Sequence, residues 1–366
     1  MPGLFDPIDI GSLSLRNRIM RSATAERLGH PETGAPLPKL ADLYRALAEG
    51  EVGLIVTGHA YVERSGQPHP EQCSIADDAV IADWRTTIRP AQEAGASVMM
   101  QINHGGASCD PDVTPELLSP SGVATHDRAQ AGEMSEEDVR RIVSAFGRAA
   151  GRAQEAGLDG VQIHGAHGYL VSQFLTPSTN LREDRWGGDA DGQSRFLGEI
   201  ISAVRREVGE SYPVWIKLGV AGSGQHGFHV ADGAEVAKKC AESGVDCVEI
   251  SHALGEPEAI RRDADAPYLP MAEVVRGAVG PDYPLALVNG FSTLDAMQAV
   301  ASGRTAQIVS LCRPLISEPD LPRKMREGAT QEALCSRCGS CWPEYAGEGI
   351  ACHNDDVLAQ VGAATT

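Results

Sequence analysis

Two histidines and a tyrosine stand close together after one short apolar run, and their side chains could hold and protonate a substrate. The segment reads Val161-Gln-Ile-His164-Gly-Ala-His167-Gly-Tyr169. Two neutral imidazoles could bind zinc, or they could polarise a substrate oxygen while the tyrosine hydroxyl donates a proton. Because no carboxylate or thiol lies nearby in the sequence to complete a zinc site, the pattern favours the second chemistry.

Polar residues also end the other short apolar runs of the chain. In a barrel of parallel strands the carboxyl ends of the strands meet at one face, where active sites lie. A single histidine there is usually a hydrogen-bonded structural residue, but polar residues at the end of every run predict a shared site. They are Ser22, Thr24, Gly58, His59, Gln101, His104, Lys217, His252, Asn289, Gly290 and Arg313.

Four of the nine cysteines lie within 18 residues near the C-terminus, with the spacing C-x2-C-x2-C-x10-C. In a chain without a secretion signal, such spacing indicates metal or cluster ligands rather than disulfides. Zinc and a 4Fe-4S cluster both accept four thiolates, and a tail with only a structural role is the third interpretation. The predicted ligands are Cys335, Cys338, Cys341 and Cys352, whereas the five scattered cysteines are predicted to be small buried hydrophobes.

Eight short apolar runs alternate with helical patterns and predict the elements that position these residues. Runs without polar alternation favour strands buried on both faces. The helical pattern over 135–157 opens with a capping-box-like Ser135-Glu-Glu-Asp138 and ends at a glycine, and shorter patterns cover 234–244 and 294–303. The predicted strands lie in Asn17–Ala23, Gly53–Ala60, Ser97–His104, Gly160–Ala166, Pro213–Gly219, Cys247–Ala253, Leu285–Gly290 and Ala306–Arg313.

This alternation predicts an α/β fold, a (β/α)8 TIM barrel over residues 3–330 with an N-terminal hairpin over 8–16 capping its bottom. Residues 331–366 are predicted to form a short cysteine-rich extension. Two long intervals, 105–134 and 168–193, follow strand ends, and long loops of this kind are usually functional. We expect both to cover the barrel mouth.

One motif resembles a dinucleotide-binding turn but lacks its context. Gly222-Ser-Gly224-Gln-His-Gly227 has the G-x-G-x-x-G spacing. In a Rossmann site the third glycine lies within the opening helix, whereas the helical pattern here starts only near Asp232. The motif is therefore predicted to be a flexible loop at the barrel rim.

The charge balance limits the partners. The 366 residues carry a formal net charge of −19, which disfavours nucleic acid and anionic membranes. No apolar run approaches the roughly 20 residues that cross a bilayer, and the N-terminus shows no signal-peptide pattern. We expect a cytoplasmic protein that acts on a small molecule, with homo-oligomerisation left open.

In their order along the chain, the motifs resemble the Old Yellow Enzyme family of FMN-dependent oxidoreductases over about residues 3–330. The resemblance implies FMN across the barrel mouth and NAD(P)H as co-substrate. The matching pieces are Asn17–Thr24, Gln101–His104, the His164-x-x-His167-Gly-Tyr169 motif, Phe174–Gly188, Lys217, Asn289-Gly290 and Arg313–Ile316.

The resemblance also implies roles toward FMN. Lys217 would lie at N1–O2, where a positive charge stabilises the reduced flavin, and Gln101 would bond the pyrimidine edge. The strand-one residues Ser22, Ala23 and Thr24 would meet the ring, with Gly58 adding a backbone contact and His164 lying close by. The phosphate would be held at the ends of strands seven and eight by Asn289, Gly290, Cys312 and Arg313, although many members have glycine in place of Cys312.

For catalysis, the resemblance implies reduction of an activated C=C bond. His164 and His167 would hold the electron-withdrawing oxygen, and Tyr169 would protonate the α-carbon. Trp186, which replaces a commoner tyrosine, and His252 would contact the substrate.

The cysteine tail is similar to that of the trimethylamine dehydrogenase and 2,4-dienoyl-CoA reductase branch, which implies a 4Fe-4S cluster. The further reductase region of that branch does not follow before Thr366. An FMN/iron-sulfur dehydrogenase that oxidises an amine or similar donor and passes electrons to a separate carrier is therefore the first alternative function. A non-catalytic flavin or iron-sulfur redox sensor is the second.

Overall fold

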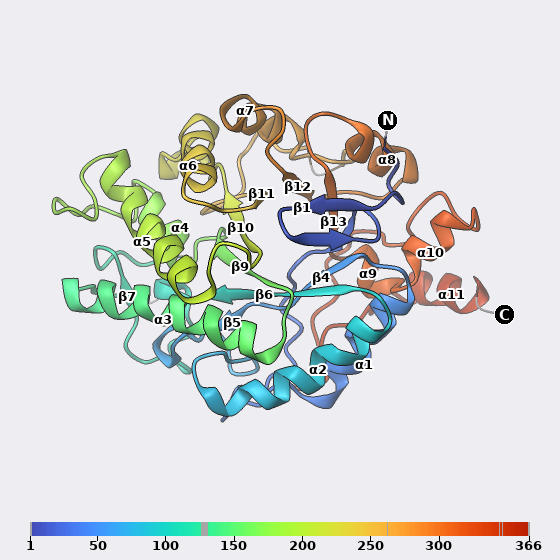
Figure 1. Cartoon of the computed structure of the whole chain (residues 1–366), viewed down its shortest axis with the longest axis horizontal. Coiled ribbons are helices and arrows are strands. Elements are labelled where there is room, and N and C mark those ends of the chain that lie inside the picture. The colour runs from blue at the N-terminus through green and yellow to red at the C-terminus, as the bar shows by residue number, and fades with distance from the viewer. Residues whose placement is uncertain (1, 126–130, 262, 344, 346, 365–366) are drawn as a thin grey trace.

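Eight parallel strands close into a barrel with helices around it in the computed structural model, which describes residues 2–125, 131–261, 263–343, 345 and 347–364 (Figure 1). Each strand pairs with the next, and β3 closes the ring by pairing with β13. This architecture confirms the predicted barrel. The strands are β3 (Ile19–Arg21), β4 (Leu54–Val56), β6 (Ser97–Asn103), β9 (Gly160–Gly165), β10 (Val214–Gly219), β11 (Cys247–Ser251), β12 (Leu285–Val288) and β13 (Ile308–Leu311).

Helices of 9 to 21 residues cover the outside of the barrel. They are α1 (Pro38–Glu49), α2 (Ile81–Glu93), α3 (Glu136–Ala156), α5 (Ala190–Val208), α6 (Val230–Glu242), α7 (Leu269–Val279) and α8 (Leu294–Ser302). The shorter α4 (Leu170–Leu175) follows β9, and α9 (Pro314–Ser317) and α10 (Leu321–Arg326) follow β13. Short additions are β5 (Ala60–Tyr61), β7 (Leu118–Ser119) and β8 (Gly132–Glu133).

Local sequence signals account for the helix ends. The Ser135 hydroxyl accepts from the Asp138 amide at the start of α3 while the Asp138 carboxylate accepts from the Ser135 amide, and Gly157 ends the helix at φ 89°. Helix α6 differs from the prediction because it begins at Val230, where the His229 backbone amide donates to the Asp232 carboxylate. The Gly227 of the G-x-G-x-x-G motif lies before this helix, in a loop at φ 70°, as predicted.

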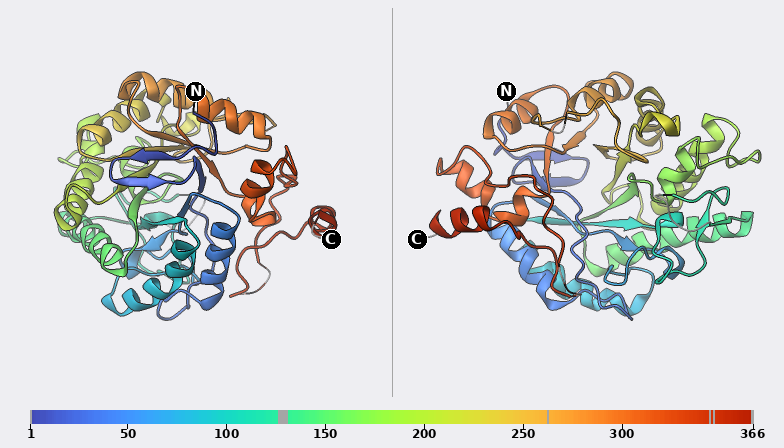
Figure 2. Two further views of the ribbon diagram at one scale, coloured as in Figure 1. Left: turned by 45° about the vertical axis from the view of Figure 1, so that its right-hand side comes forward. Right: turned by 180° about the vertical axis from the view of Figure 1, so that it is seen from behind.

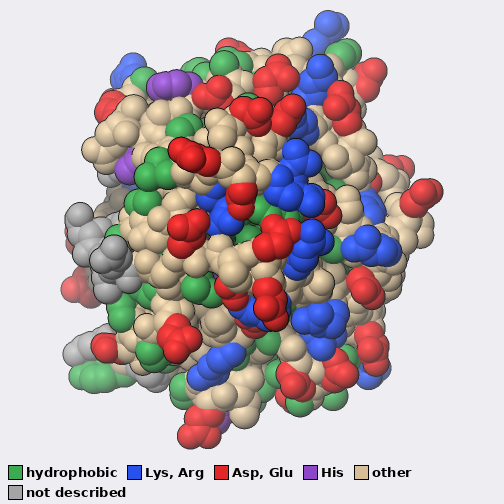
Figure 3. Space-filling view, turned by 90° about the vertical axis from the view of Figure 1, so that its left-hand side faces the viewer, with side chains coloured by type: hydrophobic (Ala, Val, Ile, Leu, Met, Phe, Trp, Pro, Cys, Tyr) green, Lys and Arg blue, Asp and Glu red, His purple; other side chains and the backbone are tan. Residues whose placement is uncertain are grey.

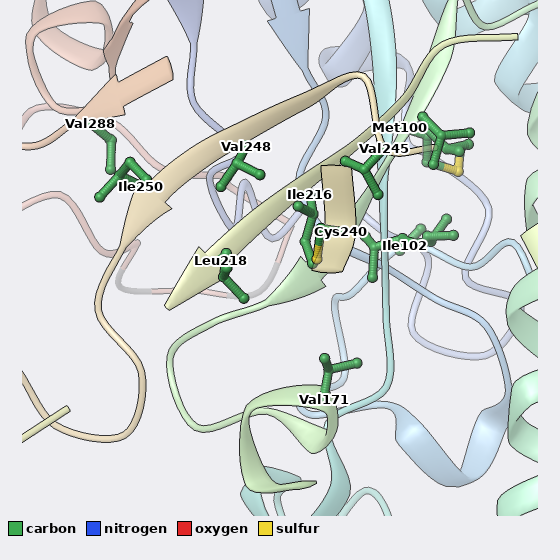
Figure 4. Packing of buried hydrophobic residues seen from close by; sticks show 14 of the residues in the cluster. Met100, Ile102, Val171, Ile216, Leu218, Cys240, Val245, Val248, Ile250 and Val288 are labelled. Carbon is green, nitrogen blue, oxygen red and sulfur yellow. The ribbon is translucent and has the colours of Figure 1, made fainter. Parts of the chain in front are cut away.

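Two sets of apolar side chains build the core. Strand side chains that face outward, such as Ile216, Leu218, Val248 and Ile250 (Figure 4), form one apolar cluster with residues of the surrounding helices. Side chains that face inward fill the lower barrel, where Trp215, Met99 and Met20 pack against the hairpin of β1 (Ile8–Ile10) and β2 (Leu13–Leu15). The hairpin therefore closes the amino-terminal end of the barrel, as predicted, and leaves the other end for a site.

The C-terminal extension leaves the ring of helices and runs along its outside, ending in α11 (Asp355–Ala364) near α9 and α10 (Figure 2). Helix α11 contacts α9, which follows the last barrel strand. The extension therefore lies next to the segment that follows β13.

Among the described residues, no helix is long and apolar enough to span a bilayer.

Candidate active site

A cavity of about 630 Å³ opens at the carboxyl ends of the barrel strands, within the usual range of small-molecule sites. The predicted substrate residues His167 and His252 lie on its wall. So do many of the predicted cofactor residues, namely Ser22, Ala23, Lys217, Asn289, Gly290, Cys312 and Arg313. Barrel closure thus brings together residues that are almost 300 positions apart in the chain.

Lys217 reaches the cavity from β10 and is held from two sides. Its Nζ atom lies 2.6 Å from Ser22 Oγ and 3.1 Å from Glu249 Oε1. Both ion-pair partners are almost completely buried, at 4% and 0% side-chain exposure. A buried charge is tolerated only when it is paired and hydrogen-bonded, so Glu249 is the reason that an ammonium can stand at this point. Glu249 was not singled out from the sequence.

Another part of the cavity wall suits an anion. Asn289 and Gly290 both have positive φ, 88° and 74°, and successive amides in such a turn form a concave anion-binding nest. A Cβ on Gly290 would lie 2.3 Å from Pro267 Cδ, so only glycine fits there. The Arg313 side chain lines the same region, and a guanidinium is well suited to phosphate.

A second arginine on this wall, Arg337, was not anticipated from the sequence. It lies between Cys335 and Cys338 and extends from the tail to the cavity. Its guanidinium pairs with Asp265 at 2.5 Å and donates to Ser292 Oγ at 2.7 Å, while its carbonyl accepts from Arg313. The tail is thereby tied to the anion-binding end of the cavity.

The histidine–tyrosine motif forms one continuous group of rings at the end of β9. The ring centre of His164 lies 5.1 Å from that of His167 and 4.8 Å from that of Tyr169. His59, which follows β4, adds a ring 5.2 Å from Tyr169, and His252 lies 4.7 Å from His167. Residues from two further strand ends, those of β4 and β11, therefore lie beside the motif.

Burial keeps these histidines neutral. Desolvation, followed by the charges of neighbouring histidines and Lys217, holds the pKa of His164 and His167 well below the ordinary value, and desolvation lowers the pKa of His59 to about 3. His164 Nδ1 accepts from the Ala166 amide at 3.2 Å, which leaves its proton on Nε2. His164 is thus a neutral hydrogen-bond donor, the form that polarises an oxygen without transferring charge to it.

Besides Tyr169 and Trp186, four predicted site residues lie outside the cavity lining. Gln101 and His164 are buried at 1% and 3% exposure, and Thr24 Oγ1 contacts Cys312 Sγ at 3.3 Å. Gly58 is packed so closely that a Cβ would lie 2.5 Å from the Thr24 carbonyl oxygen, so its glycine requirement has a structural cause. Their predicted contacts with a cofactor stay predictions.

Trp186 also lies away from the cavity. It is 1% exposed, its indole donates to the Glu136 carboxylate at the start of α3, and Arg185 covers its ring. This is the position of a residue that anchors the 168–193 interval to α3. A direct contact with substrate, which the resemblance implied, has no support from this geometry.

All four tail cysteines line one small cavity beside α9, together with Asn354 and Arg313. Asn354 Nδ2 lies 3.8 Å from Cys338 Sγ and is a donor to that sulfur. Among the residues that the structure describes, no three His, Cys, Asp or Glu side chains stand close enough to hold a single metal ion. The scattered Cys109, Cys240 and Cys247 are buried as predicted, but Cys73 and Cys312 are only half-buried.

The surface around the mouth carries both signs of charge. Figure 3 views the molecule from the side toward which β6 points in Figure 1, and shows Lys and Arg side chains interspersed with Asp and Glu. No continuous basic field of the kind that nucleic acid requires is visible on the described part of this face.

A barrel whose mouth combines a buried lysine, an anion nest and a histidine–tyrosine group defines a flavin-type oxidoreductase site, and comparisons with known proteins agree. The NADH:flavin oxidoreductase / NADH oxidase family matches residues 3–332. This chain belongs to that family. The predicted resemblance is thereby confirmed for the barrel.

Individual relatives match over most of the chain. A metal reductase from Desulforamulus reducens is 33% identical over 336 residues, covering 90% of this chain and 49% of the relative. An NADPH dehydrogenase from a Geobacillus species is 33% identical over 327 residues, covering 87% of this chain and 92% of the relative. The solved complex of a 2-naphthoyl-CoA reductase superimposes with a TM-score of 0.89 at 25% identity, covering 98% of this chain and 58% of that one.

The relatives differ in how much of their length this chain covers. The chain spans about half the length of two curated relatives, 49% and 53%, but almost all of the NADPH dehydrogenase, 92%. The family match itself extends over the barrel, residues 3–332.

Proposed function

We propose that the protein reduces the activated C=C bond of an α,β-unsaturated substrate with FMN, using NAD(P)H as the reductant. The observation that carries this proposal is a barrel mouth where one cavity is lined by a buried cation, an anion nest and the neutral His167, with His164 next to His167 and Tyr169 next to His164 at the same strand end. When bound, FMN supplies hydride transfer from the nicotinamide to the alkene β-carbon.

The residues present fit this cofactor. Lys217, fixed by Ser22 and Glu249, would place a positive charge at the N1–O2 edge. Arg313 and the amides of Asn289 and Gly290 would hold the phosphate. Gln101 would bond the pyrimidine edge, and Ala23, Thr24, Gly58 and Cys312 would line the ring and phosphate as the family resemblance implies.

The histidines and the tyrosine have separate tasks toward the substrate. As neutral donors, His164 and His167 hold the substrate oxygen and stabilise the negative charge that develops on it in a site shielded from water. Tyr169 then donates its hydroxyl proton to the α-carbon, so that the O–H bond breaks as a C–H bond forms. The resulting phenolate recovers a proton from solvent. His252, beside His167, contacts the substrate at the rim of the cavity.

Anaerobic mixing of the purified protein with NADH or NADPH tests this function. The flavin released on denaturation should be FMN, either nicotinamide should bleach its visible absorbance, and 2-cyclohexen-1-one should restore it while cyclohexanone is formed. A protein that binds no flavin, or whose reduced flavin is not reoxidised by any enone, would contradict the proposal.

For the tail, beyond the barrel of residues 3–330, we propose a 4Fe-4S cluster on Cys335, Cys338, Cys341 and Cys352 in residues 331–366. The four cysteines share one cavity. Thiolates around a single zinc ion would lie only about 3.8 Å apart, because each Zn–S bond is about 2.3 Å. A cube of iron and sulfide holds its thiolates farther apart, in keeping with the finding that no three of these described side chains stand close enough to hold a single metal ion.

Anaerobically purified protein should contain iron and acid-labile sulfide near four of each per chain. A Cys341→Ser variant should lose most of both, whereas Cys240→Ser, which changes a buried cysteine in α6, should retain them. Stoichiometric zinc without sulfide in the wild-type protein would show that the cysteine tail holds a structural zinc ion instead of a cluster.

The cytoplasmic location, the oligomeric state and a separate electron carrier stay predictions of the sequence.

A further inference from the structure

A carboxylate at the floor of the mouth, Glu249 on β11, collects hydrogen bonds from several strands. Its side chain has 0% exposure. Oε1 accepts from Ser22 Oγ at 2.9 Å and from Ser310 Oγ at 2.7 Å, and it lies 3.1 Å from Lys217 Nζ. Oε2 accepts from Gln162 Nε2 at 2.9 Å. Surrounded by donors, Glu249 acts here only as an acceptor.

Two buried amides continue the hydrogen bonds from Glu249 across the barrel. Gln162 on β9 donates to Glu249, and its Oε1 accepts from Gln101 Nε2 on β6 at 2.7 Å. An amide has a donor end and an acceptor end of nearly the same shape, so its orientation depends on its partners. Since the Glu249 carboxylate only accepts, Gln162 must turn its NH2 group toward Glu249 and its carbonyl toward Gln101. Gln101 must then turn its NH2 group toward Gln162.

This row of hydrogen bonds, which runs from Glu249 through Gln162 to Gln101, ends at the Gln101 carbonyl oxygen. Within the part of the chain that the structure describes, no hydrogen bond reaches Gln101 Oε1. The oxygen is not one of the fully buried side-chain atoms that lack a partner, so a donor that arrives with a ligand can reach it. The N3–H group of a flavin pyrimidine ring is such a donor.

We propose that Glu249 is a positioning residue for the flavin, and that this role rests on the proposed FMN site. Its carboxylate orients Gln162 and Gln101 so that Gln101 presents a carbonyl oxygen to the flavin N3–H. The same carboxylate holds the Lys217 ammonium beside Ser22. One buried negative charge thus determines that Gln101 offers an acceptor, and not a donor, to the pyrimidine edge of the cofactor.

The test is a pair of variants, Glu249→Gln and the swapped Glu249→Gln/Gln162→Glu. In the single variant an amide NH2 replaces the oxygen that accepts from Gln162, so the row must reverse or lose a bond. In the swapped variant the carboxylate at position 162 accepts from both neighbours, which restores the orientation of Gln101 and the wild-type net charge.

Titration of apoprotein into FMN, followed by flavin fluorescence, should give a Kd about 10- to 100-fold higher for Glu249→Gln than for wild type. The swapped variant should bind FMN more tightly than the single variant but less tightly than wild type, because the carboxylate again orients Gln101 while Lys217 stays without its direct partner. With ¹⁵N-labelled FMN, the N3 resonance should move toward its non-hydrogen-bonded position in the single variant and return in the swapped one. A general loss of packing would not be rescued by moving the carboxylate to another strand.

Wild-type and Glu249→Gln proteins with the same Kd and the same N3 resonance would overturn the positioning role while leaving the proposed function intact. A swapped variant that binds as weakly as the single one, with wild-type circular dichroism, would overturn it as well. Failure of the wild-type protein to bind FMN at all would instead overturn the proposed function on which this role rests.

Discussion

Replacing Tyr169 by phenylalanine is expected to slow reduction of an enone by about 10²–10⁴-fold, which is the usual effect of losing a positioned acid. The flavin should still be reduced by NAD(P)H at the wild-type rate, because that half-reaction needs no proton from Tyr169. Phenylalanine keeps the ring that packs against His164 at 4.8 Å and His59 at 5.2 Å, so the histidines stay in place. Stopped-flow measurement of the two half-reactions separates these effects.

A matched control for this substitution is Tyr283→Phe, which removes a hydroxyl that donates to the Val245 carbonyl far from the barrel mouth. It should change neither half-reaction. Equal losses in both half-reactions of Tyr169→Phe would indicate that Tyr169 shapes the site instead of donating the proton. If neither half-reaction slows, another group, such as His252, supplies the proton.

Replacing Lys217 by alanine is expected to lower the free energy of unfolding by about 3–5 kcal/mol, the cost of breaking a buried ion pair from one side. The cause is Glu249, which would stay in the barrel interior with hydrogen bonds but without an opposite charge. Urea unfolding of the apoprotein at neutral pH measures the loss.

The double variant Lys217→Met/Glu249→Gln removes both charges and should recover most of that stability. At FMN concentrations that saturate this variant, its flavin reduction by NAD(P)H should nevertheless stay slow, because no cation remains to stabilise the reduced cofactor. This pair of measurements separates the structural role of the ion pair from its role toward the flavin. A Lys217→Ala protein as stable as wild type would show that water or a rearrangement compensates the unpaired charge of Glu249. Normal flavin reduction in the double variant would show that Lys217 does not act on the flavin.

The elements of this fold could be predicted because their signals are local. A glycine at φ 89° ends α3, a serine and an aspartate begin it, and continuous apolar runs mark strands buried on both faces. The His164–Tyr169 motif is likewise contained in one strand end, so its three side chains are neighbours in any arrangement of the barrel. The family resemblance added the cofactor, which no local pattern specifies.

Trp186 shows the limit of such inference. The resemblance placed it at the substrate, but the structure buries its indole against Glu136. The partner lies 50 residues away in the sequence, on the helix before β9. The residues around Trp186 in the sequence give no sign that its indole packs against that helix.

The sequence by itself determined the barrel, its caps and the polar residues at its strand ends, since these depend on neighbours along the chain. Only the tertiary structure decided which of those residues meet. Glu249 alternates with apolar residues in Cys-Val-Glu-Ile-Ser, and this charged residue within an apolar run was the one available signal of an inward-facing ion pair. Its partners come from β9, β10, β13 and the end of β3. They converge because closing a barrel brings inward-facing residues of distant strands into a common layer, where a buried charge must find its hydrogen bonds.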